Sequence, residues 1–197
     1  ILSDMGEYAL YTIEQELTES ARECGWEGTE IIAEMGSLID RPTVHRLMQR
    51  HRPNTVFHAA AYKHVPLVEA NSIAGMRNNI FCTMNTALEA EAVGVDHFIL
   101  LSTDKAVRPT NVMGASKRVC ELVLQGLASR KTDTRFAMVR FGNVLGSSGS
   151  VVPRFQKQIS EGGPVSWTHK DITRYCMTIP EAAQLVIQAG GMAQGGE

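Results

Sequence analysis

The side chains best suited to acid–base chemistry in this sequence follow one apolar run. Residues 97–101 (HFILL) have the pattern of a buried strand, and the polar residues 102–105 (STDK) come directly after it. Turn-forming residues then lead into a helical pattern in which Met113 and Lys117, four positions apart, share one helix face. An acid, an amine and a hydroxyl group are therefore expected close together, with a second amine arriving from the helix.

The position of these groups indicates a binding or catalytic site. In an open α/β sheet, ligands bind beyond the carboxyl ends of the strands, which is where Asp104 and Lys105 fall. Each of these residues alone would be more typical of a solvated loop with ordinary surface charges. The four groups together favour chemistry.

Composition restricts the class of protein. The 197 residues are 44% hydrophobic and 20% charged, which suits one soluble α/β domain with a sizeable core. The formal net charge of −2 gives no electrostatic footprint for nucleic acid or an anionic membrane. The four cysteines are widely spaced without a C-x-x-C pair, so we interpret them as reduced thiols and predict no metal site.

Strands and helices alternate along the sequence. Strands are predicted around residues 1–4, 30–36, 54–61, 97–103, 134–141 and 164–168. Helices are predicted around residues 7–19, 42–50, 71–93 and 111–130, from Pro153, and from Pro180, with a flexible loop over 142–149. This alternation is typical of a doubly wound parallel sheet with right-handed crossovers.

Several single positions could contact a dinucleotide, and each has an ordinary structural alternative. Asp4 ends the first strand, where an acid can hold ribose hydroxyls, although an Asp before a helix is more often a cap. Ala59–Ala61 would let a flat ligand approach the backbone, but close helix packing uses alanine equally well. His64 is either a ligand donor or simply solvated. Asn79, in mid-helix, is disfavoured there unless its side chain bonds something.

Three longer motifs resemble one known family. HAAAYKHVPLVE (58–69), STDKAVRPTNVMGASK (102–117) and RFGNVLGSSGSVVPRF (140–155) closely resemble the nucleotide-sugar 4,6-dehydratases of bacterial polysaccharide biosynthesis, the CapD-like family of extended short-chain dehydrogenase/reductases. The similarity runs nearly end to end. It implies a Rossmann-type fold, a tightly bound and recycled NAD(P), and a UDP-sugar substrate, typically UDP-N-acetylglucosamine. The implied domains are an N-terminally incomplete cofactor-binding domain over 1–145 and part of the substrate-binding region over 146–197.

The resemblance also implies roles for individual residues. Thr103 matches the hydroxyl of the superfamily's triad, Lys117 its lysine on the nicotinamide ribose, Asp104 the general acid and Lys105 the general base. The implied cofactor-binding residues are Asp4, Ser37, Leu38, Ala59, Ala60, Lys63, Asn79, Ser102, Lys117 and Val144. The implied substrate-binding residues are Lys63, Asn143, Ser150, Val151, Thr168 and Arg174, the last as a diphosphate contact.

The sequence departs from the family pattern at several positions. The glycine-rich fingerprint that precedes the first acidic position is absent from the chain, and Ser37 stands where many relatives have an adenine-side Asp. Ser148 replaces an arginine of some relatives, which leaves Arg154 for the phosphates. Met113 occupies the position of the superfamily's catalytic tyrosine, as it does in a subgroup of these dehydratases.

The implied reaction has no net redox change. Hydride leaves sugar C4 for the nicotinamide, Lys105 removes the C5 proton, Asp104 protonates the departing C6 hydroxyl, and hydride returns to C6. Lys105 must then be neutral part of the time, and we expect desolvation to raise the pKa of Asp104. Because the Met113 thioether has no proton to give, Thr103, water or Asp104 must take part in the first oxidation.

Two other functions stay open. One is a nucleotide-sugar 4-epimerase or reductase on the same scaffold, which would not need an acid–base pair at C5 and C6. The other is a non-catalytic dinucleotide sensor, which Met113 favours. Family members usually carry membrane-spanning helices before this domain, and the chain starts without Met in a strand-like Ile1-Leu2. We therefore expect a fragment of a membrane-anchored homo-oligomer, with this domain on the cytoplasmic face.

Overall fold

The computed structural model describes residues 1–197 except 27, 131, 148–150, 167–168, 170 and 172. Its helices are α1 Glu7–Glu23, α2 Arg41–His51, α3 Val65–Ala70, α4 Ser72–Val93, α5 Val112–Ala128, α6 Val151–Ser160 and α7 Ile179–Met192, with a short 3-10 helix, η1, at Asp104–Ala106. Its strands are β1 Leu2–Asp4, β2 Ala33–Met35, β3 Thr55–His58, β4 His97–Thr103, β5 Arg135–Phe141, β6 Asn143–Val144 and β7 Cys176–Met177.

Every strand pair in the described part of the chain is parallel, which confirms the predicted α/β class. β4 is the central strand of the largest sheet, with β3 on one side and β5 on the other. β1 pairs with β2, and β6 pairs with β7, so the strands form three separate sheets rather than one. Since β3, β4 and β5 run in the same direction, their carboxyl ends meet at one edge.

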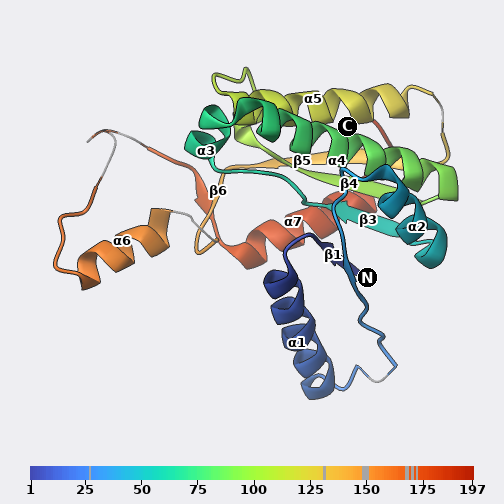
Figure 1. Ribbon diagram of the computed structural model, residues 1–197, viewed down its shortest axis with the longest axis horizontal. Helices are drawn as coiled ribbons and strands as arrows, with labels where there is room; N and C mark the ends of the chain where they lie inside the picture. Colours follow the sequence, from blue (N-terminus) through green and yellow to red (C-terminus); the bar gives the residue numbers. More distant parts are fainter. Residues whose placement is uncertain (27, 131, 148–150, 167–168, 170, 172) are drawn as a thin grey trace.

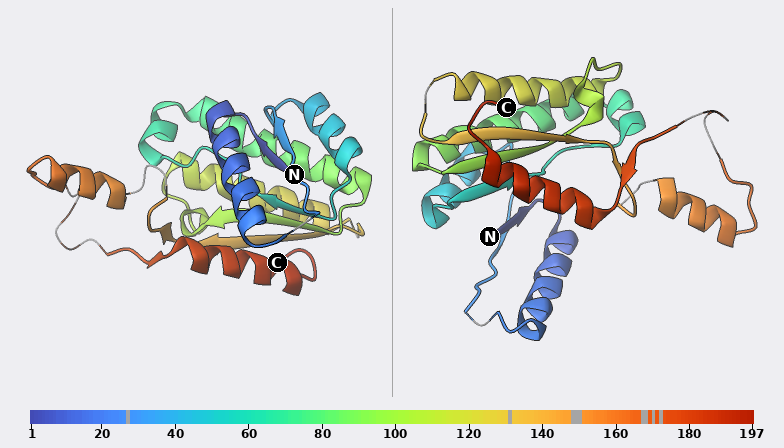
Figure 2. Two further views of the ribbon diagram at one scale, coloured as in Figure 1. Left: turned by 90° about the horizontal axis from the view of Figure 1, so that it is seen from below. Right: turned by 180° about the vertical axis from the view of Figure 1, so that it is seen from behind.

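Helices cover both faces of the β3–β4–β5 sheet. α4 and α5 lie side by side on one face, and α7 crosses the other (Figure 1). The two further views show the same layers and show α1 and α6 extending away from the sheet (Figure 2). This arrangement leaves the carboxyl edge of the sheet between the starts of α5 and α7.

Local sequence signals explain where the helices begin and end. The side chains of Asp40 and Asn111 accept hydrogen bonds from main-chain N–H groups in the first turns of α2 and α5. Thr178 and Glu181 form a capping box at the start of α7. Gly94 ends α4 in the left-handed conformation, with φ of 76°.

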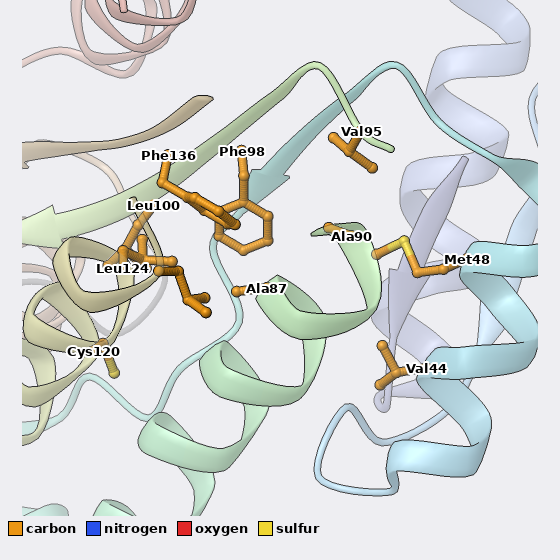
Figure 3. Packing of buried hydrophobic residues seen from close by; sticks show 11 residues of the cluster. Val44, Met48, Ala87, Ala90, Val95, Phe98, Leu100, Cys120, Leu124 and Phe136 are labelled. Carbon is orange, nitrogen blue, oxygen red and sulfur yellow. The ribbon is translucent and has the colours of Figure 1, made fainter. Parts of the chain in front are cut away.

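The hydrophobic core lies between the sheet and the α4–α5 layer. Phe98 and Phe136, on neighbouring strands, are fully buried and their ring centroids lie 5.6 Å apart. Figure 3 shows both rings packed toward Ala87 of α4, with Leu124 of α5 beside them. Full burial of such a side chain contributes roughly 1.5–3 kcal/mol, so this cluster fixes α4 and α5 against the sheet.

The structure corrects several predicted elements. β3 ends at His58, so Ala59–Ala61 belong to a loop and not to the strand. Residues 164–166 are not in a strand, and the short strand of this region is β7 instead. The loop predicted over 142–149 contains β6, whose pairing with β7 links residues distant in sequence. Among the residues described, no helix is long and apolar enough to cross a membrane.

Candidate active site

A cavity of about 1440 Å³ opens at the carboxyl edge of the β3–β4–β5 sheet. Its walls come from the loop after β3, the ends of β4 and β5, the first turns of α5, and parts of α6 and α7. The predicted site residues on its wall are Ala59, Lys63, Ser102, Thr103, Lys105, Met113, Lys117, Asn143, Val144 and Arg174. The fold thus brings the three sequence motifs together around one space.

Lys105 and Asp104 form an ion pair beside this cavity. The Lys105 Nζ lies 3.0 Å from the Asp104 Oδ1 and 3.5 Å from the Asn143 Oδ1. The Thr103 hydroxyl donates to the same Asp104 oxygen at 3.0 Å. The side chains of Lys105 and Asp104 stay 31% and 48% exposed, so water screens the pair and its contribution to stability is small. Its significance is chemical.

The Asp104 carboxyl is held in its ionised form. Burial alone would raise its pKa, but hydrogen bonds from Lys105 and Thr103 outweigh burial and leave the pKa below the ordinary value. The expectation that desolvation raises the pKa of Asp104 is therefore wrong for this conformation. The cause is the ion pair, which favours the charged form of the carboxyl.

Two glycines let the main chain approach the ion pair closely. A Cβ added at Gly114 would collide with the main-chain oxygen of Lys105. A Cβ added at Gly142 would lie 2.9 Å from the Tyr175 main-chain oxygen and 3.6 Å from the Asp104 Oδ2. Thr103 also accepts a bond from the Lys105 main-chain N–H at 3.3 Å and so starts η1. Gly114 thus fixes the Lys105 end of the turn by backbone packing, and the Thr103 hydroxyl fixes its start.

α5 presents Met113 and Lys117 to the cavity from one face. Both residues are nearly buried, at 4% and 5% exposed. Burial lowers the pKa of the Lys117 ammonium, while Cys120 and Glu121 oppose that shift. Met113 supplies an apolar surface without a proton to exchange.

The loop after β3 is held from behind by Asn79. The Tyr62 main-chain N–H donates to the Asn79 Oδ1 at 2.7 Å, and the Asn79 Nδ2 donates to the Tyr62 carbonyl at 3.0 Å. The same Nδ2 donates to the Ser116 Oγ at 2.9 Å, and Ser116 donates to the Met113 carbonyl at 2.7 Å. Asn79 is fully buried behind the wall, where it connects the Tyr62 loop to the α5 turn that carries Met113.

His58, at the end of β3, is a fully buried neutral imidazole. Burial, and then the Lys117 charge, lower its pKa to about 3. The Thr83 hydroxyl donates to the Asn79 carbonyl at 2.9 Å, so the His58 Nε2, 3.1 Å from that hydroxyl, is the donor of their hydrogen bond. His58 therefore supports α4 in its neutral Nε2–H form.

Other predicted site residues lie elsewhere or outside the described residues. Asp4 ends β1 and accepts a bond from the Gly6 N–H at 2.7 Å. Ser37 and Leu38 lie between β2 and α2, and Leu38 packs on the core. The cavity wall described above contains none of the four residues Asp4, Ser37, Leu38 and Ala60. Ser150 and Thr168 are outside the described residues, and Val151 starts α6 with an undescribed side chain.

The apolar part of the wall was not predicted from the sequence. Phe57, Phe141, Phe155, Ile179 and Val186 line it, and α7 contributes several of these contacts. Their spacing resembles ordinary core residues, and only the exposed face of β3 at Phe57, 50% exposed, is unusual for a strand. Arg154 also lines the cavity, as the sequence suggested for a phosphate contact.

The four cysteines are all free and fall into two groups. Cys82 of α4 and Cys120 of α5 are buried. Burial raises the pKa of both thiols, that of Cys82 to about 11. Cys24 and Cys176 are exposed, and Cys176 of β7 lines the cavity.

The residues present fit a dinucleotide together with a sugar nucleotide. Small Ala59 allows close approach to the β3 loop, and the Lys117 side chain adds a nearly buried cationic donor to the wall. Arg154 and Arg174 add cationic groups on the α6 and β7 side, which suit phosphates. A cavity of this size and mixed lining can hold two ligands side by side and exchange protons with one of them at the Lys105–Asp104 pair.

Comparison with known proteins places the chain in one family. The model of the family described as "Polysaccharide biosynthesis protein" matches residues 1–197. The capsular polysaccharide biosynthesis protein CapD of Staphylococcus aureus is 48% identical over 197 residues, covering 100% of this chain and 32% of CapD. A UDP-N-acetylglucosamine 4,6-dehydratase (inverting) of Campylobacter jejuni is 39% identical over 148 residues, covering 72% of this chain and 43% of that protein. The chain thus spans less than half of either relative.

Solved structures share the fold. The X-ray structure of Pen from Bacillus thuringiensis superimposes with a TM-score of 0.89 at 33% identity, covering 98% of this chain and 58% of that one. The UDP-glucose 4-epimerase of Thermus thermophilus, solved in complex with NAD, gives a TM-score of 0.77 at 19% identity, covering 91% of this chain and 71% of that one. The second likeness concerns the fold alone, which is of the Rossmann-type α/β class.

Proposed function

The chain belongs to the polysaccharide biosynthesis protein family, and we propose that it is the catalytic part of an enzyme. The proposed enzyme is an NAD(P)-dependent nucleotide-sugar 4,6-dehydratase. The proposed substrate is UDP-N-acetylglucosamine, in keeping with the name of the Campylobacter jejuni relative. The observation that carries the proposal is the Lys105–Asp104 pair, 3.0 Å apart beside the cavity. Dehydration across C5 and C6 needs a base and an acid close together, and this pair supplies both.

A proton transfer inside the pair would give the two forms that the elimination needs. At rest, the Lys105 Nζ donates a hydrogen bond to the Oδ1 of the Asp104 carboxylate. When substrate covers the pair and excludes water, two charges become costlier than two neutral groups. Transfer of the shared proton then leaves a Lys105 amine to take the C5 proton and an Asp104 acid to protonate the C6 hydroxyl. The two groups act as one coupled unit.

The other wall residues orient the reactants. When bound, NAD(P) supplies the hydride acceptor for sugar C4 and the hydride donor for C6. Lys117, on the buried wall, would hold the nicotinamide ribose, and Met113 would exclude water from that part of the cavity. Thr103, whose hydroxyl bonds Asp104, is the proposed relay through which the O4 proton leaves to water before substrate closes over the pair, so that the pair keeps one shared proton for the elimination. Arg154 and Arg174 bind the diphosphate of the sugar nucleotide.

One assay distinguishes this function from its alternatives. The full-length protein is incubated with UDP-N-acetylglucosamine and NAD or NADP, and the product is followed by mass spectrometry and NMR. Loss of one water supports the dehydratase. An isomer of unchanged mass would indicate the epimerase, and bound cofactor without turnover would indicate the sensor that Met113 favours. Either result would overturn the proposal.

Four features of the whole protein are predicted from the sequence. They are the membrane anchor, the homo-oligomer, the position on the cytoplasmic face, and the boundary between the two domains at residues 145 and 146. Sedimentation of cell membranes would test the anchor, because an anchored full-length protein should pellet with them. Mass photometry of the protein after detergent extraction would test the oligomer.

A further inference from the structure

Glu121 is a buried carboxylate that the proposed mechanism does not use. It lies on α5, one turn after Lys117, and its side chain has no exposed surface. It accepts bonds from the Ser102 Oγ at 2.6 Å, the Arg140 Nε at 2.8 Å and the Arg118 Nη1 at 2.9 Å. Burial alone would raise its pKa, but the bonds from Arg140, Ser102 and Arg118 lower it to about 2, so the group is always ionised near neutral pH.

The ionised carboxylate fixes what Ser102 can offer to a ligand. A carboxylate only accepts hydrogen bonds, so the single Ser102 hydroxyl proton is committed to the Glu121 Oε1. Ser102 also lines the cavity. Toward a ligand it can therefore present lone pairs alone, and it selects for an N–H or O–H donor.

The same charge acts on Lys117. Burial lowers the pKa of Lys117, and Cys120 and then Glu121 oppose that effect; because burial raises the pKa of the Cys120 thiol, Glu121 is the one of the two that is charged near neutral pH. His58 of β3, which is neutral, and Cys120 of α5 are also near the ammonium. The charged or titratable groups on the other elements packed against α5 include Glu69 of α3, Cys82 of α4, Asp104 and Lys105 of η1, and Arg140 of β5. Glu121 is thus the anion, on Lys117's own helix, that offsets the cost of its burial.

We propose that Glu121 is a positioning residue that orients the Ser102 hydroxyl as an acceptor and carries a negative charge one turn from Lys117 on the same helix, so that both Ser102 and Lys117 bind the dinucleotide. This inference rests on the proposed function, because it assigns Ser102 and Lys117 to the cofactor. Arg140 and Arg118 hold the carboxylate in place from β5 and α5. One side chain therefore joins β4, α5 and β5 at the cavity edge.

The test is a titration of the full-length protein with NAD by calorimetry at a series of pH values from neutral to alkaline. In Glu121→Gln, the loss of the anion should move the alkaline limit of NAD binding to lower pH. Glu89→Gln is the matched control, because Glu89 is also buried and accepts bonds from Arg41 and His45, but lies between α4 and α2. It should lose stability without moving the pH limit.

Two milder variants keep the proposal testable if Glu121→Gln does not fold. Ser102→Ala should weaken NAD binding roughly fivefold at every pH, the effect of one lost hydrogen bond. Glu121→Asp keeps the charge but withdraws it from Ser102, so it should weaken binding similarly and leave the pH limit unchanged. NAD binding by Ser102→Ala equal to wild type would overturn the inference.

The remaining outcomes separate the inference from the function beneath it. A Glu121→Gln profile that superimposes on wild type, or a Glu89→Gln profile that shifts equally, would overturn the inference alone. A wild-type protein that binds neither NAD nor NADP would instead overturn the proposed function.

Discussion

The main-chain oxygen of Lys105 lies against Gly114, so closely that a methyl group on Gly114 would overlap it. We expect Gly114→Ala to push the Asp104–Lys105 turn away from the first turn of α5. Overpacking of this kind costs about 1–3 kcal/mol of stability. Because misplacement of a catalytic group by about 1 Å can cost about 100-fold in rate, turnover should fall by at least about tenfold.

The same helix offers a control for this change. A Cβ added at Gly126 of α5 meets nothing within 4 Å, so Gly126→Ala should stabilise the protein by roughly 0.5–1 kcal/mol. Urea unfolding and initial rates are compared for both variants. Equal rates for Gly114→Ala and wild type would show that the close approach has no catalytic consequence.

Lys105→Ala should abolish dehydration while NAD binding is kept. A general base contributes about 10²–10⁴-fold to the rate, so turnover should fall by at least about 100-fold. Solvent deuterium should also no longer enter at C5. Lys157→Ala, which removes an exposed lysine of α6 paired with Glu161, is the control. Near-normal turnover by Lys105→Ala would exclude Lys105 as the base.

His58 should make the fold sensitive to acid. Its pKa is about 3 in the folded protein and near 6.5 in the unfolded chain. Below pH 6.5 the unfolded chain therefore binds a proton that the folded chain does not, and stability falls as the pH drops from about 6.5 toward 3. His58→Gln should reduce this loss by roughly a few kcal/mol, measured as the free energy of unfolding in urea at each pH.

The control for His58 is His64→Gln, which changes an exposed histidine of the neighbouring loop. It should leave the slope of stability against pH close to that of wild type. If His58→Gln also keeps the wild-type slope, protonation of His58 is not coupled to unfolding and its buried neutral state is not the cause.

Met113 should act through its shape and not through a proton. Met113→Leu keeps volume and apolarity and should cost less than about 1.5 kcal/mol in stability, with hydride transfer little changed. Met113→Tyr should fold and bind NAD without gaining much activity, because Thr103 or water already handles the O4 proton. Stopped-flow absorbance of the reduced nicotinamide gives the rate for each variant. A large acceleration in Met113→Tyr from a nearly inactive wild type would favour the sensor.

The strand ends and the site loop were predictable because their signals are local. Residues 97–103 form β4 as predicted, since a continuous apolar run bounded by polar residues has few other solutions. Lys105, Met113 and Lys117 meet at the cavity because the parallel topology brings strand ends to one edge.

The remaining features depend on contacts between distant residues. The lowered pKa of Asp104 requires knowing that its neighbour folds back onto it. β6 and β7 are too short to show a periodic pattern in the sequence, and each is a strand only because it pairs with the other. Glu121 appeared as one more helix residue, because its partners Ser102 and Arg140 come from two strands that only the fold places beside it.

The distribution of thiols gives the cavity a chemical reporter. Since only thiolates react readily, the raised pKa values of Cys82 and Cys120 protect them from mild alkylating reagents. Modification should therefore be confined to Cys24, at the end of α1, and Cys176, on the cavity wall. The ratio of the two labelled peptides then measures occupancy: a ligand in the cavity shields Cys176 while Cys24 serves as the internal standard. Candidate nucleotides can be ranked in this way in a crude extract, before any activity is known.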